Sequence, residues 1–255
     1  MLEVMSPEQA RRELDGEFTS LRGKIWKTAK WSPDNKDDSW PNGNRHDQFT
    51  KFNPSLPWWL MCDLGGATGA YIVVQQTKAA YRGQELFSGP VWVAVADLCP
   101  RDDASAARSF ALLKENFGTP VGVTAGADVN TRAATDGSTV SYFAQQCFGN
   151  APVYPCNESV YSKQVQYDVL SFLMCSAINE RRFTIARDFV SLDPYSSRGV
   201  REMIEEDEWP EETKRRPTDF LPKNKDNVVQ HTRDALLMGF SQLSPPSWGR
   251  GNAPA

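Results

Sequence analysis

The longest helical pattern in the chain runs from Ser159 to Pro194. Asn157 or Ser159 offers a side-chain oxygen to the free backbone amides at its start, and Pro194 ends it by lacking an N–H donor. The apolar residues of this segment recur at steps of three and four, which places them on one side of a helix: Val165, Val169, Phe172, Leu173 and Ala177. We therefore expect one continuous core helix here, with the rest of the chain packed around it.

The far end of this segment is charged. Arg181, Arg182, Arg187 and Asp188 stand among apolar residues. They either form the solvated side of the helix, with Asp188 in a local ion pair, or form an ordered cluster that contacts phosphates or a neighbouring subunit. Arginine suits the second role because its planar guanidinium bridges two oxygens at once. The pattern alone leaves both interpretations open.

A second, narrower stripe lies near the N-terminus. Ser6, Pro7 and Glu8 are typical of a helix start. Four apolar residues then follow at spacings of four, three and four: Leu14, Phe18, Leu21 and Ile25. This stripe packs either on the protein's own core or on another subunit, and residues 31–57, which are polar and rich in proline, are predicted to be a linker.

Residues 58–97 resemble a nucleotide-binding arrangement in outline. An apolar run ends in a glycine turn with Gly65, Gly66 and Gly69, residues 71–81 are predicted to be helical, and a strand over 91–96 leads to Asp97. This is the element order of a dinucleotide-binding unit. However, the segment has no GxGxxG fingerprint, and Asp97 lies too far from the glycines for the usual ribose contact. We therefore favour a helix entered through a flexible glycine turn.

The remaining pattern is mostly helical. Helices are predicted over 104–113, ending at Gly118, over 139–148 and over 226–240, whereas 119–138 and 245–255 are predicted to be irregular. The expected fold is mainly α, with a helical core and extended N- and C-terminal arms. Its boundaries are an arm and linker over 1–57, a core over 58–204 and a second arm over 205–255.

The amino-acid composition narrows the class of protein to which this chain can belong. Among 255 residues, 40% are apolar and 24% are charged, which is ordinary for a globular protein, and the net charge of −4 excludes a strongly basic nucleic-acid binder. No run of eighteen apolar residues exists, so we expect no membrane span, and the N-terminus lacks the order of a signal peptide. The five cysteines form no CxxC pair, so we expect reduced, packed thiols in a cytosolic protein.

Motifs for catalysis are absent from the sequence. The two histidines, His46 and His231, have no zinc-like spacing, and no GxSxG, HExxH or P-loop motif is present. The acidic residues over 34–38 do not match the register of a calcium loop. We therefore expect neither a metal nor a cofactor, and a structural or binding protein rather than an enzyme.

Two segments resemble a known family. Residues 182–192, with the sequence RFTIARDFVSL, look like the signature of flexible filamentous virus coat proteins of the potexvirus and potyvirus type. Residues 227–234, with the sequence NVVQHTRD, resemble the segment that follows in the potyvirus type. Arg187 stands where the family prefers an aromatic residue, and the upstream arginine that would pair with Asp188 is not identified, with Arg108 and Arg132 as the candidates.

The resemblance implies an all-helical body with extended arms that polymerises into a helical filament around single-stranded RNA. Asp188 would then belong to a buried polar cluster beside the RNA groove, with Arg181, Arg182 and Arg187 as RNA contacts. A nearly neutral coat protein binds RNA if polymerisation adds many weak phosphate contacts. The N-terminal stripe would join neighbouring copies, and the protein would be found in the virion and the host cytoplasm.

Two other classes stay open from the sequence. One is a nucleotide-cofactor enzyme built on the glycine turn and Asp97. The other is an accessory subunit of a larger complex that contains no nucleic acid.

Overall fold

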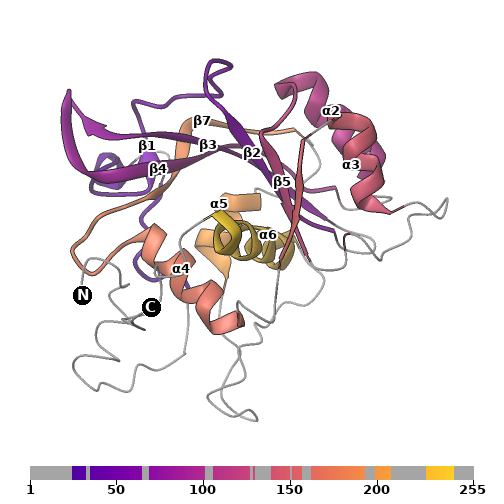
Figure 1. Cartoon of the computed structure of the whole chain (residues 1–255). Coiled ribbons are helices and arrows are strands. Elements are labelled where there is room, and N and C mark those ends of the chain that lie inside the picture. Colours follow the sequence, from indigo (N-terminus) through magenta and orange to yellow (C-terminus); the bar gives the residue numbers. More distant parts are fainter. Residues whose placement is uncertain are drawn as a thin grey trace, which may run out of the picture.

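A seven-stranded β-sheet lies at the centre of the molecule (Figure 1). The computed structural model describes residues 25–32, 35–64, 69–100, 106–126, 129, 139–149, 151–156, 162–192, 199–207 and 228–243. Helices cover both faces of the sheet, so the fold is mixed α/β. The expected mainly α body with a helical core was therefore wrong.

The strands are β1 (Arg45–His46), β2 (Trp58–Asp63), β3 (Ala70–Tyr81), β4 (Gln84–Leu98), β5 (Gly122–Ala125), β6 (Val153–Pro155) and β7 (Phe183–Ser191). The helices are the short 3-10 turn η2 (Lys36–Asp38) and the α-helices α2 (Ala106–Phe117), α3 (Val140–Phe148), α4 (Lys163–Met174), α5 (Gly199–Glu206) and α6 (Val228–Leu243). The strand order across the sheet is β1-β7-β4-β3-β2-β5-β6.

The middle of the sheet is an antiparallel meander of β2, β3 and β4. Ile72 of β3 lies opposite Met61 of β2 and Asp97 of β4. Beyond the meander the pairing becomes parallel on both sides. β5 lies parallel to β2, and β6 parallel to β5. On the other side, β7 lies parallel to both β4 and β1.

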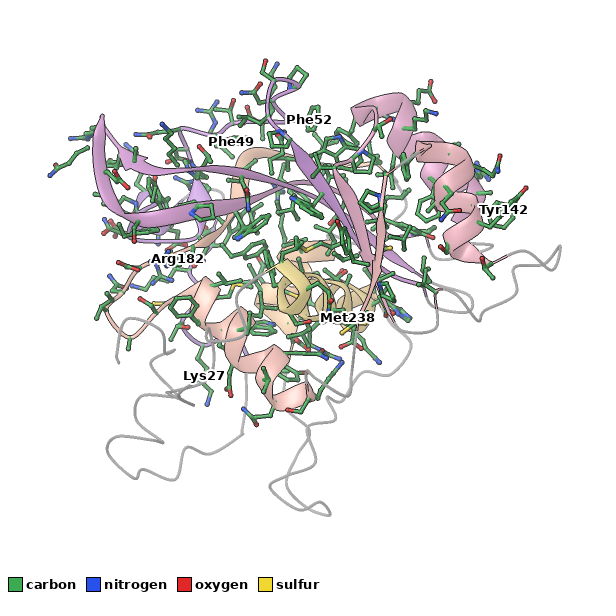
Figure 2. The ribbon with its side chains drawn as sticks, in the orientation of Figure 1. Lys27, Phe49, Phe52, Tyr142, Arg182 and Met238 are labelled. Carbon is green, nitrogen blue, oxygen red and sulfur yellow. The ribbon has the colours of Figure 1, made fainter. Side chains whose placement is uncertain are left out.

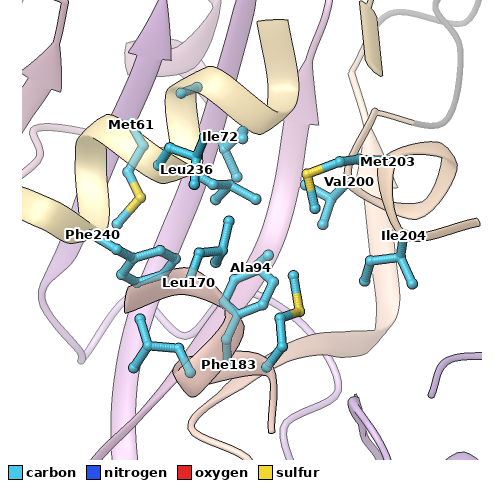
Figure 3. Close-up of a cluster of buried hydrophobic side chains, with 14 of the residues drawn as sticks. Met61, Ile72, Ala94, Leu170, Phe183, Val200, Met203, Ile204, Leu236 and Phe240 are labelled. Carbon is cyan, nitrogen blue, oxygen red and sulfur yellow. The ribbon is translucent and has the colours of Figure 1, made fainter. Parts of the chain in front are cut away.

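The two faces of the sheet carry separate cores, because successive side chains of a strand point to opposite faces. Met61, Ile72 and Ala94 point toward α4, α5 and α6, where they meet Leu170, Leu236 and Phe240 (Figure 3). Leu60, Val73 and Val93 point to the other face, where α2 and α3 contribute Phe110, Leu113 and Phe148. Strands buried on both faces read as continuous apolar runs, which hides their two-residue period.

The expected central helix is shorter than predicted. α4 ends at Met174, and Asn179 adopts a positive φ of 65°, which turns the chain back toward the sheet. Residues 183–191 then form β7 instead of helix, so the helical prediction was wrong beyond Met174. The segment is rich in β-branched and aromatic residues, which fit the pleated surface of a sheet. Within α4, the predicted core positions Val169, Phe172 and Leu173 are buried, as expected.

The helix expected over 71–81 was also wrong, since these residues are in β3. Tyr71, Ile72, Val73 and Val74 are all buried, two on each face. An apolar run of this length is equally consistent with a buried helix and a buried strand. The strand expected over 91–96 is confirmed as part of β4. The helices expected over 104–113, 139–148 and 226–240 are confirmed as α2, α3 and α6.

The segment predicted to be a linker is packed against the body. Trp31, Trp40 and Phe49 are buried, and β1 joins the edge of the sheet. Segments on both sides of the boundaries expected at residues 57 and 205 thus contribute to one sheet and its covering helices. No helix in the described ranges is long and apolar enough to cross a membrane.

A buried ion pair links α6 to the residue that follows α5, on one face of the sheet. Arg233 of α6 and Asp207, which follows α5, approach to 2.6 Å between Nη1 and Oδ1, and each side chain is only 1% exposed. Asp207 also accepts a 3.0 Å hydrogen bond from the indole of Trp26. Trp26 in turn stacks on Tyr167 of α4. This network joins four segments that are distant in the sequence.

Candidate active site at the carboxyl edge of the sheet

Asp63 and His231 form a close pair at one edge of the sheet. Asp63 is the last residue of β2, and His231 lies in the first turn of α6. Oδ2 of the carboxylate is 2.6 Å from Nδ1 of the imidazole. The side chain of Asp63 is 22% exposed and that of His231 is 10% exposed, so the fold holds the pair while the carboxylate stays partly open to solvent.

Close packing of α6 on the sheet brings the two residues together. Gly239 lies so near the sheet that a Cβ there would be 2.5 Å from Sδ of Met61 and 3.0 Å from Oγ1 of Thr124. Only a residue without a side chain permits this approach. Phe240, fully buried against Trp92 and Phe183, anchors the same helix. The first turn of α6 is thereby held above the end of β2.

The pair lies where ligands are commonly bound in sheets of this kind. The carboxyl ends of the parallel strands β2 and β5 point to the same edge, but the chain continues from β2 toward β3 and from β5 toward β6. Asp63 therefore lies at the carboxyl end of β2, beside the carboxyl end of β5. In open α/β sheets, ligands commonly bind outside the carboxyl ends of the strands.

The geometry suits proton transfer. If Nδ1–H of His231 donates to the carboxylate of Asp63, the ring is fixed in one orientation and Nε2 carries the lone pair. A carboxylate in this position also stabilises the imidazolium that forms when Nε2 accepts a proton. The nearby thiol of Cys62 is fully buried and donates to the backbone oxygen of Thr124, so it does not suit the role of nucleophile.

The carboxylate of Asp63 also offers an oxygen to a hard divalent cation. In the described part of the chain, no group of three His, Cys, Asp or Glu residues could hold a metal ion by protein ligands alone. Magnesium does not require such a group, because it is usually bound by one or two carboxylates, several waters and substrate phosphates. Asp63 therefore fits an open cation site that solvent and an anionic substrate complete, while His231 stays available as a proton acceptor.

Asp97 is buried and structural. It accepts hydrogen bonds from Oγ of Ser191 at 2.6 Å and from the backbone N–H of Val200, near the start of α5, at 3.1 Å. Burial raises the pKa of this carboxyl to about 6, although both hydrogen bonds act in the opposite direction. The nucleotide-cofactor alternative also required a helix after the glycine turn, where the structure has the antiparallel strand β3. Gly65 and Gly66 lie outside the described residues.

The four predicted RNA contacts do not share one site. Arg181 is 2% exposed, and its guanidinium donates to the backbone oxygens of Thr28, Asn42 and Met174. Arg182, which is labelled in Figure 2, is also buried. It pairs with Glu180 at 2.7 Å, and its guanidinium lies over the ring of Phe87. These two arginines hold the chain between α4 and β7 in place.

Arg187 and Asp188 lie on the surface of β7 and pair with each other at 3.0 Å. Asp188 was expected in a buried polar cluster, but its side chain is 54% exposed. Arg108, a candidate partner for it, lies on α2, and Arg132 is outside the described residues. Of the expected subunit contacts, Ile25 is buried in the protein's own core, whereas Leu14, Phe18 and Leu21 also lie outside the described residues.

Sequence reasoning did not find the Asp63–His231 pair. One signal for Asp63 was available, because an apolar run from Trp58 to Cys62 ends in an acid directly before a glycine-rich turn. That is the pattern of a buried strand followed by a polar site. No comparable signal existed for His231, because its partner lies 168 residues away.

Comparison with known proteins finds a likeness among solved structures. No protein-family model matches the chain, and no curated protein matches it. The crystal structure of the large terminase nuclease from the thermophilic phage G20c matches 76% of this chain and 86% of its own, with 12% identity and a TM-score of 0.45. An overall likeness at this level does not decide function.

The coat-protein interpretation was wrong. A seven-stranded sheet replaces the all-helical body that the family resemblance required, so the expected helical filament is wrong as well. The expectation that the protein is not an enzyme loses the support of this resemblance and is given up with it. The short matches over 182–192 and 227–234 lie in β7 and at the start of α6, in a different architecture.

Proposed function

We propose that this protein is a metal-dependent hydrolase that cleaves phosphodiester bonds in nucleic acid, with Asp63 and His231 at the reaction centre. The observation that carries the proposal is the 2.6 Å approach of Asp63 Oδ2 to His231 Nδ1 at the carboxyl edge of the sheet. A partly exposed carboxylate and a largely buried imidazole at this position supply a cation ligand and a proton acceptor, respectively.

Each residue has a distinct task. Asp63 holds the ring of His231 through Oδ2 and offers Oδ1 to a divalent cation. His231 accepts the proton of the attacking water at Nε2, and the carboxylate stabilises the resulting imidazolium. A bound divalent cation would neutralise the charge that develops on the phosphoryl oxygens.

The position of the pair favours an anionic substrate. His231 lies in the first turn of the sixteen-residue helix α6, whose amino end carries partial positive charge. Backbone N–H groups at such an end suit phosphate oxygens. A phosphodiester meets both requirements, because it binds the cation and the helix end with the same group.

The test is cleavage of labelled single-stranded and duplex DNA and RNA by the full-length protein with Mg²⁺ or Mn²⁺. We expect cleavage that EDTA abolishes, and a rate at least about 100-fold lower for Asp63→Asn and His231→Gln. The first variant removes the cation ligand and the charge that stabilises the imidazolium, and the second removes the proton acceptor. Glu115→Gln, which removes an exposed carboxylate on α2, is the matched control and should retain the wild-type rate.

Metal binding gives an independent readout. Mn²⁺ should raise the melting temperature of the wild-type protein and have little effect on Asp63→Asn, because a ligand stabilises only a state that binds it. Full cleavage by purified Asp63→Asn, or no cleavage of any of the four substrates by the wild type, would contradict the proposal.

A further inference from the structure

A second surface feature lies at the opposite end of the sheet. An open groove of about 520 Å³ runs between the segment 36–47, the turn that joins β3 to β4, and β7. Its lining residues are Lys36, Ser39, Trp40, Pro41, Asn42, Arg45, Asp47, Tyr81, Arg82 and Arg187. Four of the ten are cations and one is an anion, so the groove is positive in a protein whose net charge is −4.

The one acid of the groove is already neutralised. Asp47 accepts hydrogen bonds from Nε of Arg45 at 2.8 Å and from Oγ of Ser39 at 2.6 Å. The arginine hydrogen bond lowers the pKa of this carboxyl, so it stays charged and committed to Arg45. The positive charge that remains for a ligand is therefore that of Lys36, Arg82 and Arg187.

Arg187 reaches the groove from β7. Its ion pair with Asp188 is 53% and 54% exposed. Pairs this exposed contribute little, because water screens them. A phosphate can therefore compete for the guanidinium at small cost, and it offers the bidentate geometry that arginine prefers.

Arg82 is held in an unusual backbone conformation. It has a φ of 52° and is followed by Gly83 with a φ of 83°, in a two-residue turn between Tyr81 and Gln84. Hairpin turns of this kind strongly favour Asn, Asp or Gly at the first position. An arginine with a positive φ at this position costs free energy, and strained backbone conformations of this kind are concentrated at functional sites. The guanidinium lies 5.2 Å from the centre of the Tyr81 ring.

We propose that this groove binds the phosphate backbone of a nucleic-acid strand, at a site separate from the Asp63–His231 pair. The groove wall formed by the aromatic residues Trp40 and Tyr81 favours a nucleic acid, rather than an acidic protein segment, as the ligand. Grooves for nucleic-acid strands combine cations that follow the backbone with an aromatic ring on which a base stacks. Tyr81 is half-buried and can serve as that ring, since it leans edge-on against the buried Trp40.

The two sites are far apart. Ala70 at the start of β3 lies opposite Asp63, and Tyr81 is eleven residues further along the same strand, which is at most about 36 Å of strand at 3.3 Å per residue. That length corresponds to roughly ten base pairs of duplex. Binding at the groove is therefore a function of its own, which can exist whether or not Asp63 supports cleavage.

The test measures binding and not cleavage. Fluorescence anisotropy of labelled 20-nucleotide single-stranded DNA, single-stranded RNA and duplex DNA is followed in EDTA over a range of salt concentrations. The double variant Arg82→Asn/Arg187→Gln removes two groove cations, and asparagine retains the turn conformation at position 82. We expect at least tenfold weaker binding and a salt slope smaller by one to two, because fewer counterions are released.

Two further variants separate this proposal from the proposed hydrolase. Arg108→Ala removes an exposed arginine from α2, on the side of the molecule away from the hairpin turn (Figure 1), and should bind like the wild type. Asp63→Asn should also retain binding, even if cleavage is never observed. Unchanged affinity and salt slope in the folded double variant would overturn the groove proposal, as would competition by polyglutamate but not by unlabelled DNA or RNA.

Discussion

Arg181 shows how a single residue can be misread from its type. In the sequence it begins a cluster of arginines that suits phosphate binding. In the structure its guanidinium is buried among backbone oxygens and the side-chain oxygen of Asn44, 2.9 Å from Nη1. Burial lowers its pKa, but five donors in a planar arrangement satisfy carbonyls from several segments at once. A charged residue therefore indicates a ligand only when its burial is known.

His46 provides a prediction at the same scale. It is buried against Trp40, and its Nδ1 accepts the backbone N–H of Phe49 at 3.1 Å. Burial lowers the pKa of His46 to about 4, although Asp47 acts in the opposite direction. Since the unfolded chain takes up a proton near pH 6.5 and the folded protein does not, the free energy of unfolding decreases as pH falls from 7 to 4. The contribution is about 3 kcal/mol.

The measurement is urea unfolding of the wild type and His46→Asn at several pH values. The asparagine oxygen can accept the same N–H but does not titrate. Buried carboxyl groups such as Asp97 are present in both proteins, so their opposite pH dependence cancels in the difference. The two stability curves should converge as pH falls, and parallel curves would show that the pKa of His46 is the same in the folded and unfolded states.

Among the elements, α6 is the one on which the candidate site depends. It carries His231 at its start and packs on β2 and β5 through Gly239. A glycine in an exposed helix usually gains about 1 kcal/mol of stability when it becomes alanine. At Gly239 the sign should reverse, because the added methyl group meets the buried Met61.

We expect Gly239→Ala to lower the free energy of unfolding by about 1–3 kcal/mol. The rate of cleavage should fall as well, because a displaced α6 moves His231 away from Asp63. In a Met61→Ala background there is room for the added methyl group, so Gly239→Ala should lower the free energy of unfolding much less. A double-mutant cycle measures this difference. Gln242→Ala on the same helix is the control, and an equal loss in it would remove the packing explanation.

Sequence patterns predicted the helices α2, α3 and α6 and the apolar part of β4, but they missed β3 and β7. α2, α3 and α6 were found because residues such as Phe110 and Leu113 recur at helical spacing. β3 and β7 were not found, because side chains such as Ile72 and Val73 are buried on opposite faces of one sheet. The apolar run then carries no two-residue period, and its length alone does not separate strand from helix.

For the molecule as a whole, the buried pair of Arg233 and Asp207 joins α6 to the segment after α5 and, through Trp26, to the N-terminal part. Arg233→Met should lower the free energy of unfolding by about 3–5 kcal/mol, because it leaves a carboxylate buried without its charged partner. Asp207→Leu in addition removes that charge, so the double variant should recover part of the loss. Thermal or urea unfolding measures both.

Greater instability of the double variant than of Arg233→Met would mean that Asp207 acts mainly through Trp26.

The Asp63–His231 pair could not be predicted from the sequence. Asp63 was recognisable as an acid after a strand, but its pairing with His231 is set by the packing of the whole sheet and its helices. A single sequence contains no record of which residues meet across 168 positions.

The place of β7 between β4 and β1 has a consequence for synthesis of the protein. Residues 45–46 and 84–98 leave the ribosome long before residues 183–191, with which they pair. At 5–20 residues per second, β4 waits for roughly 5–20 s with one hydrogen-bonding edge unfilled. An apolar strand with an open edge pairs readily with other chains. The nascent chain thus passes through a period in which it depends on chaperones or on the ribosome itself for protection.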